Sequence, residues 1–301
     1  MFLNWLGALP GAAAQGIIWG IMAIGVYITY KILDIADLTV DGSICTGGAV
    51  CAVLITNGAP VWVAMVAAVV AGMLAGLVTG LLHTAMGIPP ILAGILTQLM
   101  LWSINLKIMG KSNIPLPIGT YDLLLRQINK TQSLIVLALF VAVGVTLLYC
   151  FLGTEMGNAL RATGNNINMS RAQGINTDFT KVLGLVISNG IVALSGALLA
   201  QYQSFADISM GRGAIVIGLA AVVIGEAVVS KISQNYAVRL LGVIAGGVIY
   251  YFVYQTVIFL GLDADLLKML SALVVAVFLA IPYWKNKRQS RYRGKGGKNH
   301  A

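Results

Sequence analysis

Four acidic side chains lie in or beside strongly apolar stretches, where a carboxylate needs a specific partner. The phrase ADLTVDGS contains Asp37 and Asp41, its near copy ADISMGRG contains Asp207, and Glu226 follows in the segment VIGEA. A carboxylate at the centre of a membrane helix costs about 2.5–3.5 kcal/mol, so each must cap a helix, pair with a cation, line a polar path or lie near an interface. Helix capping, solute binding and ion coupling are therefore the chemistries that these residues could do.

The two phrases also carry the residue types that start a helix from irregular backbone. Glycine permits a non-helical entry, and Asp, Ser and Thr side chains accept hydrogen bonds from the free N–H groups of the first turn. For any single aspartate, a cap in an interfacial loop is the simpler interpretation, and Glu226 could equally pair with Lys231 or form a subunit contact. For the paired elements together we predict a translocation path. Its candidate residues are Asp37, Thr39, Asp41, Gly42, Ser43, Asp207, Ser209, Gly211, Gly213 and Glu226.

The composition determines what kind of scaffold must position these residues. Of the 301 residues, 58% are hydrophobic and only 10% are charged, with a mean hydropathy of +0.89. A single water-soluble core cannot bury that much apolar surface, and several runs reach the ~20 residues that cross a bilayer. We therefore predict an all-α, polytopic transmembrane bundle of about nine spans. The expected spans are 11–31, 43–57, 60–83, 89–109, 133–152, 180–202, 213–230, 238–260 and 265–284.

The net charge of +9 comes largely from the end of the chain. Residues 285–301 hold seven of the 19 Lys and Arg residues and no acid. A basic segment just past an apolar run is typical of the cytoplasmic side of a membrane, where it can contact anionic lipid. We predict a transmembrane domain over 1–284 and a basic cytoplasmic tail over 285–301, and no nucleic-acid partner.

Two predicted helices are too short to span, and each follows one of the two phrases. Ile44–Thr56 has 13 residues and Ala214–Val229 has 16, or roughly 20 and 24 Å of helix. A shift of 170 positions superimposes the phrases and gives eight identities in 37 positions. The copies begin five spans apart, so they enter the membrane from opposite sides. This predicts an inverted-topology repeat, about 11–152 and 180–284, whose short helices line the path.

A polar connection, about 153–180, separates the two repeats. Within it, NNINMSRAQGI predicts a short helix with an Asn cap at Asn165 or Asn166 and a stop at Gly174. Two turns of exposed helix are unstable alone, so this helix needs a partner. The alternative is a plain linker between the repeats.

These residues resemble a known family. TEMGNALRATGNNINMSRAQGIN resembles the coupling-helix region of ABC importer permeases of the branched-chain amino acid and ribose type, and ADLTVDGS resembles that family's early phrase. The likeness runs over about 15–284. DLTVDGS with VIGEA looks most like the subgroup of tryptophan and tyrosine transport permeases.

The resemblance implies a multi-pass permease in a bacterial cell membrane that imports a small solute, an amino acid, and the likeness to the subgroup suggests an aromatic one. Two copies of an ATP-binding subunit would hold the coupling loops, a second permease copy would complete the complex, and an extracellular binding protein would deliver the solute. ATP and Mg²⁺ would bind the partner, since this chain lacks the Gly-x-x-x-x-Gly-Lys-Ser/Thr phosphate loop. The implied coupling residues are Arg161, Gly164, Asn165, Asn166, Ser170, Arg171, Gly174 and Ile175.

Other functions stay open from the residues alone. A secondary transporter driven by a proton or sodium ion through Glu226 or Asp37 fits the repeat but does not need a docking helix. A sugar or nucleoside permease fits the same scaffold. An enzyme is disfavoured, because we find no nucleophile with a base, and the three cysteines lack metal-ligand spacing. We expect no catalytic residue, no metal and no cofactor in this chain.

Overall fold

A computed structural model describes residues 2–117, 119–229 and 235–259 of the protein. It also describes six helical positions between 269 and 280. Ten α-helices, one π-helix and two short strands occur in the described residues. They are α1 Phe2–Tyr27, the π-helix η1 Ile28–Ile32, α2 Val40–Thr56, α3 Val61–Thr84, α4 Pro90–Met109, β1 Asn113–Pro115, α5 Lys130–Gly153, α6 Glu155–Asn165, α7 Ile167–Ala172, α8 Thr177–Gln203, β2 Phe205–Asp207, α9 Ala214–Val229 and α10 Tyr236–Phe259.

Six of these helices are long and apolar enough to cross a membrane. They are α1 with η1, α3, α4, α5, α8 and α10, while α2 and α9 are the shorter apolar helices. The prediction of a polytopic helical bundle is confirmed, and eight of the nine expected spans correspond to these eight helices. Most of the ninth span, 265–284, and the whole basic tail lie outside the described residues.

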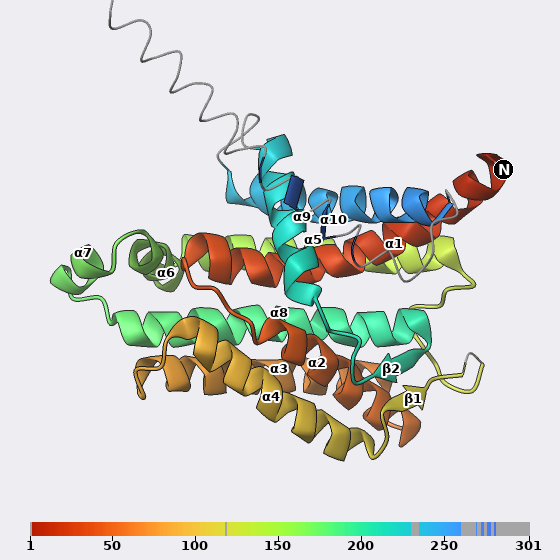
Figure 1. The fold of residues 1–301 in the computed structure, drawn as a ribbon, viewed down its shortest axis with the longest axis horizontal. Coiled ribbons are helices and arrows are strands. Elements are labelled where there is room, and N and C mark those ends of the chain that lie inside the picture. Colours follow the sequence, from red (N-terminus) through yellow and green to blue (C-terminus); the bar gives the residue numbers. More distant parts are fainter. Residues whose placement is uncertain are drawn as a thin grey trace, which may run out of the picture.

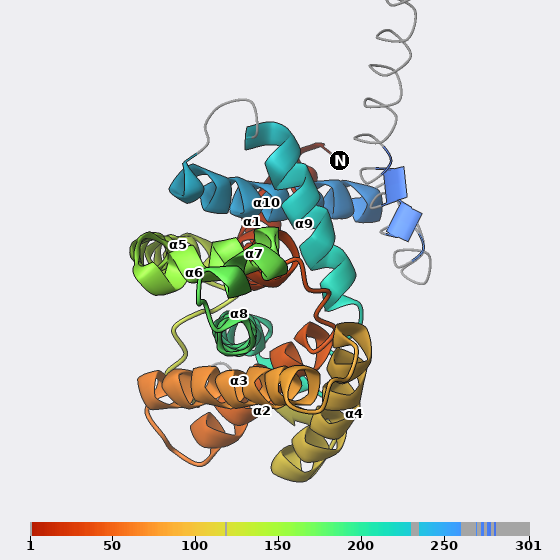
Figure 2. The same cartoon turned by 90° about the vertical axis from the view of Figure 1, so that its left-hand side faces the viewer.

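The helices form two groups on either side of a central pair. Viewed end-on, α1 and α8 lie between the group of α2, α3 and α4 and the group of α9 and α10 (Figure 2). Helix α3 packs along α8, and α10 packs along α1. Helices α6 and α7 lie at one end of the molecule, which we call the α7 end, and the β1–β2 ribbon lies at the other, the ribbon end (Figure 1).

The central helices run in opposite directions and are joined by two buried serines. Ser195 Oγ donates to the Ile18 carbonyl oxygen at 2.7 Å, and Ser188 Oγ donates to the Gly25 carbonyl oxygen at 2.8 Å. Adding 170 to Ile18 gives Ser188, and adding it to Gly25 gives Ser195. The 170-residue shift that superimposes the repeated phrases therefore turns the Ser195–Ile18 contact into the Ser188–Gly25 contact.

Helix α2 begins within the first phrase, at Val40, and α9 begins directly after the second, at Ala214. Residues 34–37, which have no regular secondary structure and begin with Asp34 at positive φ, separate η1 from α2. Helix α2 has 17 residues, four more than predicted, or about 26 Å at 1.5 Å per residue. Helix α9 covers the predicted residues, and it crosses the long helices at a steep angle (Figure 1). Neither helix reaches the ~30 Å of a hydrocarbon core.

Two features depart from the sequence prediction. The bundle is not purely α-helical, because β1 and β2 pair antiparallel at the ribbon end, with Ile114 opposite Ala206. The connection between α5 and α8 holds two helices rather than one, since α6 precedes the predicted short helix. Strands of three residues carry too little pattern to predict, and α6 forms from a segment in which three residues, Gly157, Leu160 and Thr163, are buried.

Glycines let α3 approach α8 closely. Gly72, Gly76 and Gly80 all face α8, and a methyl group at Gly76 would overlap the Leu185 carbonyl oxygen. Small residues at such spacing are the usual means of close helix packing in membranes, where dispersion contacts replace the hydrophobic effect. These three glycines therefore form a packing stripe against α8.

The substitution Gly76→Ala is expected to lower the melting temperature of the purified protein, because the added methyl group meets backbone that cannot move aside. Overpacking of this kind costs about 1–3 kcal/mol. Thermal unfolding in detergent measures it. The matched control is Gly144→Ala on α5, where an added methyl group meets no atom within 4 Å. Equal melting temperatures for the two variants would contradict the packing assigned to α3.

Candidate functional site

A buried polar cluster holds the start of α2 against the middle of α8. Asp37 is 2% exposed and accepts hydrogen bonds from the Thr39 backbone N–H at 2.9 Å and from Asn189 Nδ2 at 2.8 Å. Ser43 Oγ donates to Asn189 Oδ1 at 2.6 Å. The Asn189 amide thus bridges the two predicted path residues Asp37 and Ser43. In the described part of the chain, Asp37 forms no ion pair.

Three buried threonines extend this cluster to α3 and α4. The hydroxyls of Thr39 and Thr79 are 2.7 Å apart, and Thr79 Oγ1 donates to Thr97 Oγ1 at 2.9 Å. All three side chains are at most 2% exposed. A buried hydroxyl without a partner costs free energy. This series of hydrogen bonds between threonines therefore holds the irregular segment before α2 against α3 and α4.

Asp41 connects the two repeated phrases directly. Its carboxylate accepts hydrogen bonds from the backbone N–H groups of Gly213 and Ile215, each at 2.9 Å, at the start of α9. The Gly211 N–H in turn lies 3.1 Å from Cys45 Sγ. A shift of 170 positions carries Asp41 to Gly211 and Cys45 to Ile215. It therefore turns the Asp41–Ile215 contact into the Gly211–Cys45 contact, as it does for the two serine contacts between α1 and α8. Asp41 caps the helix of the other phrase as well as lying in the first turn of α2.

The glycines of the two phrases have different roles. Gly42 faces α4, where an added Cβ would contact Leu101 and Gln98. Gly211 packs against the Asp41 backbone, and a side chain there would overlap the Asp41 carbonyl oxygen. Gly213 has φ +85°, a left-handed conformation that glycine adopts without strain.

Asp207 and Ser209 lie apart from the buried cluster, in the turn after β2 at the ribbon end. Asp207 Oδ1 accepts from the Ser209 backbone N–H at 2.7 Å and from the Ser209 hydroxyl. This is the same Asp-x-Ser/Thr turn that Asp37 forms with Thr39. Partial burial opposes ionisation here, but the hydrogen bonds from Ser209 and Asn113 and the charge of Arg212 together hold the pKa of Asp207 below its ordinary value. The two copies of the phrase therefore share a turn but differ in burial.

Glu226 lies near the C-terminal end of α9 and pairs with a residue of η1. Its Oε2 is 3.2 Å from Lys31 Nζ, and the two side chains are 27% and 47% exposed. Part-exposed pairs of this kind contribute little stability, so the pair mainly joins α9 to the end of α1. The partner considered from the sequence, Lys231, lies outside the described residues.

The predicted short helix and its cap are confirmed in the polar connection. Asn166 Oδ1 accepts from the Met169 N–H at 3.0 Å at the start of α7, and Gly174 has φ +80°. The Ile175 N–H donates to the Ser170 carbonyl oxygen at 3.0 Å, and Arg171 Nε donates to Thr177 Oγ1 at 2.9 Å. These bonds fold the chain back from α7 into α8.

Helix α7 presents its side chains outward. Of its six residues only Ser170 is buried, and Met169 is 61% and Ile167 39% exposed. Phe179, just beyond it on α8, is 52% exposed. The isolated helix therefore carries uncovered apolar side chains at the α7 end.

The remaining predicted coupling residues lie on α6 rather than α7. Gly164 sits against η1, where a side chain would overlap the Ile32 carbonyl oxygen. Asn165 is the last residue of α6. Arg161 faces α10, with its guanidinium carbon 4.7 Å from the centroid of the Tyr236 ring.

Sequence reasoning missed Asn189, Thr79 and Thr97. Asn189 is a signal that could have been used, because it is a polar residue in the middle of an apolar span, and such residues usually have an assigned partner or role. The two threonines give no comparable signal, since threonine also occurs on apolar helix faces where it bonds its own backbone.

The family model described as branched-chain amino acid transport system / permease component matches residues 9–282. The chain belongs to this permease family. It is a permease component of a transport system of the branched-chain amino acid type and a multi-pass membrane protein.

Two curated relatives cover nearly the whole permease. A tyrosine transport system permease protein of Clostridioides difficile (strain R20291) is 44% identical over 276 residues, which is 91% of each chain. An uncharacterized protein of Rickettsia prowazekii (strain Madrid E) is 35% identical over 278 residues, 91% of this chain and 98% of the relative. No solved structure matches the chain.

The Asp37–Asn189 contact is expected to contribute to stability as a coupled pair. Asn189→Ala removes the donor to Asp37 Oδ2 and the acceptor of the Ser43 hydroxyl, while the Thr39 N–H still bonds Asp37 Oδ1, and each unsatisfied buried group costs about 1–3 kcal/mol. A double-mutant cycle with Asp37→Ala and Asn189→Ala, measured by denaturant unfolding in detergent, should give a non-additive term. Additive effects would show that the two side chains do not interact.

Asp41→Ala is expected to destabilise the permease by about 0.5–2 kcal/mol, because the first N–H groups of α9 lose their acceptor. Asp41→Asn should recover part of this loss, since an Asn oxygen also accepts. Thermal unfolding measures both, with Asp122→Ala in the exposed 110–129 connection as the control. An Asp41→Ala protein as stable as the control would refute the cap.

Proposed function

We propose that this permease is the membrane subunit of an ATP-driven ABC importer that moves an amino acid, most readily an aromatic one, delivered by an extracellular binding protein. The observation that carries the proposal is α7, a capped helix whose exposed apolar side chains need a partner. A permease that is driven by its own ion gradient has no use for such a helix. Family membership adds that such permeases serve multi-component transport systems.

In this proposal the α7 end faces the cytoplasm and a separate ATP-binding subunit receives α7. Ile167, Met169 and Phe179 provide the apolar contact. The turn at Gly174 and the Arg171–Thr177 bond keep α7 fixed relative to α8, so that a movement of α7 moves the central helix. ATP and Mg²⁺ bind in the partner, two copies of which serve a homodimer of permeases.

The membrane domain consists of two inverted repeats in this proposal. The exchanged contacts between α1 and α8, and between Asp41 and the start of α9, support this arrangement. The path runs beside the irregular segments that precede α2 and α9. The Asp37–Asn189–Ser43 cluster is its buried part, and Asp207 and Ser209 lie at its extracellular mouth.

A pull-down tests the motor. The tagged permease is solubilised from the native host, and the co-purifying ATP-binding subunit is quantified. Met169→Asp should reduce its recovery about tenfold or more, which corresponds to at least ~1.4 kcal/mol of lost affinity. The matched control is Ile128→Asp, a 73% exposed apolar residue in the 110–129 connection. A permease that transports solute with no ATP-binding subunit attached would instead favour ion-coupled transport and direct attention to Glu226.

The solute is tested with the reconstituted complex. We expect tyrosine or tryptophan to compete for uptake more strongly than leucine, ribose or a nucleoside, because the 44% identical relative is named for tyrosine transport. Competition against a labelled aromatic amino acid gives the order. Stronger competition by ribose or a nucleoside would move the assignment to a sugar or nucleoside permease.

A further inference from the structure

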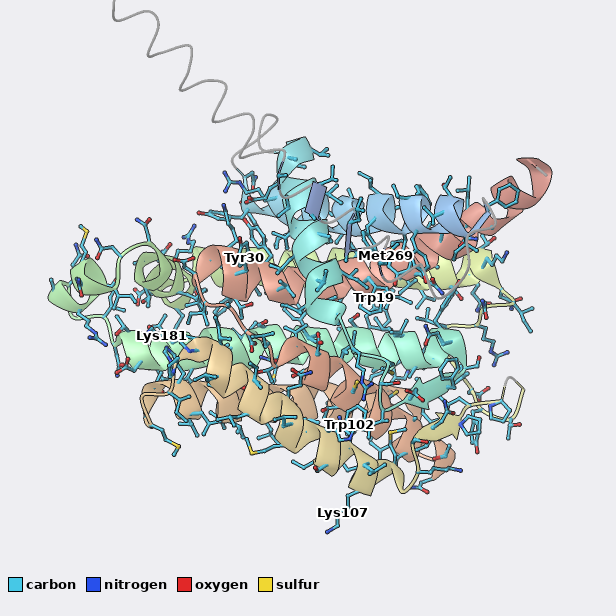
Figure 3. All side chains as sticks on the ribbon, viewed as in Figure 1. Trp19, Tyr30, Trp102, Lys107, Lys181 and Met269 are labelled. Atoms are coloured by element: carbon cyan, nitrogen blue, oxygen red, sulfur yellow. The ribbon has the colours of Figure 1, made fainter. Side chains whose placement is uncertain are left out.

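A cleft of about 780 Å³ opens at the α7 end, between η1, α6 and the start of α10. Its lining includes three cationic side chains, Lys31, Arg161 and Arg239, with Tyr30 and Tyr236 beside them. Figure 3 shows Tyr30 at the end of α1 that lies nearest α6 and α7. The cleft thus lies where two long apolar helices end, and it is separate from the buried cluster around Asp37.

The charges in this cleft are only partly neutralised. Lys31 is paired with Glu226, and Asp34 is the acid of the lining. Neither Arg161 nor Arg239 forms an ion pair with any described carboxylate. The cleft and the Glu226 side chain together hold three positive and two negative groups, so the site is net positive.

Arg161 is oriented before any ligand arrives. Its guanidinium lies over the Tyr236 ring and donates to Asn158 Oδ1. A guanidinium held in one plane by an aromatic ring keeps its other N–H groups available, and their fork geometry suits two oxygens of a phosphate. Arg239 comes from the first turn of α10, one turn after Tyr236, so both arginines line the same cleft.

We propose that this cleft binds the phosphate of an anionic phospholipid. Basic pockets between transmembrane helices, near a membrane surface, are suited to such headgroups. Tyrosines are favoured at the same depth, and Tyr30 is 42% exposed beside the cleft. On the neighbouring α9 and α10, Val228 and Leu241 are 47% and 49% exposed and give the acyl chains an apolar surface to contact. A zwitterionic lipid would add an amine to a site that is already positive, so it binds less well.

Native mass spectrometry of the delipidated full-length permease tests this site. Phosphatidylglycerol and phosphatidylethanolamine are titrated in separate arms, and inorganic phosphate and glycerol 3-phosphate form the arms without acyl chains. Arg161→Gln and Arg239→Gln should each weaken phosphatidylglycerol binding about fivefold, and the double variant more. Arg126→Gln, at the opposite end of the molecule, is the matched control. Arg239→Lys keeps the charge and should retain most of the binding.

Several outcomes would overturn the proposal. Equal binding of the two lipids, or unchanged phosphatidylglycerol binding by the double variant, would exclude a phosphate site in the cleft. Inorganic phosphate that binds as well as the lipid would make it a site for a soluble anion. Variants that keep the lipid but lose a co-purifying ATP-binding subunit would make the cleft a protein contact. All variants must elute and melt like the wild type, and Arg161→Gln alone decides the matter if Arg239→Gln does not fold.

Discussion

The structure depends on satisfying backbone groups at the starts of the two short helices. The N–H groups of a helix's first turn have no acceptor within the helix, and each would cost free energy if left alone in an apolar surrounding. Asp41 supplies the acceptors for α9, and the Asp37 turn orders the chain before α2. Each of these carboxylates also reaches a second element: Asp41 joins the two phrases, and Asp37 joins the first phrase to Asn189 on α8.

Close helix packing brings those groups within reach. Gly47 and Gly196 lie at the crossing of α2 and α8, and a methyl group on either would overlap a backbone carbonyl oxygen of the other helix. Gly72 makes a similar approach beside Asn189. Without a hydrophobic effect between helices in lipid, such contacts and a few interhelical hydrogen bonds supply the association energy. The small residues therefore set the distance between the helices, and the polar cluster sets the position of α2 along α8.

Local patterns predicted much of this architecture. The long apolar runs, the two short helices, the Asn166 cap and the Gly174 stop all follow from composition or from capping chemistry within a few residues. The hydrogen-bond partner of each carboxylate does not follow from such local patterns. Asp41 reads as a cap for its own helix, yet its oxygens accept from Gly213 and Ile215, more than 170 residues away. The pairing of Asn189 with Asp37 is equally unpredictable, because no local sequence pattern near either residue indicates the other as its partner. Helix α6 was missed because its polar sequence reads as loop until η1 and α8 are in place.

The packing of Gly164 on Ile32 has a mechanical consequence. With no side chain between them, α6 rests directly on the last turn of the first span, while the turn after α7 joins α8. The connection is thus fastened to both central helices, which run in opposite directions. A load placed on it from outside would be shared between α1 and α8, so these two helices would shift together rather than in succession.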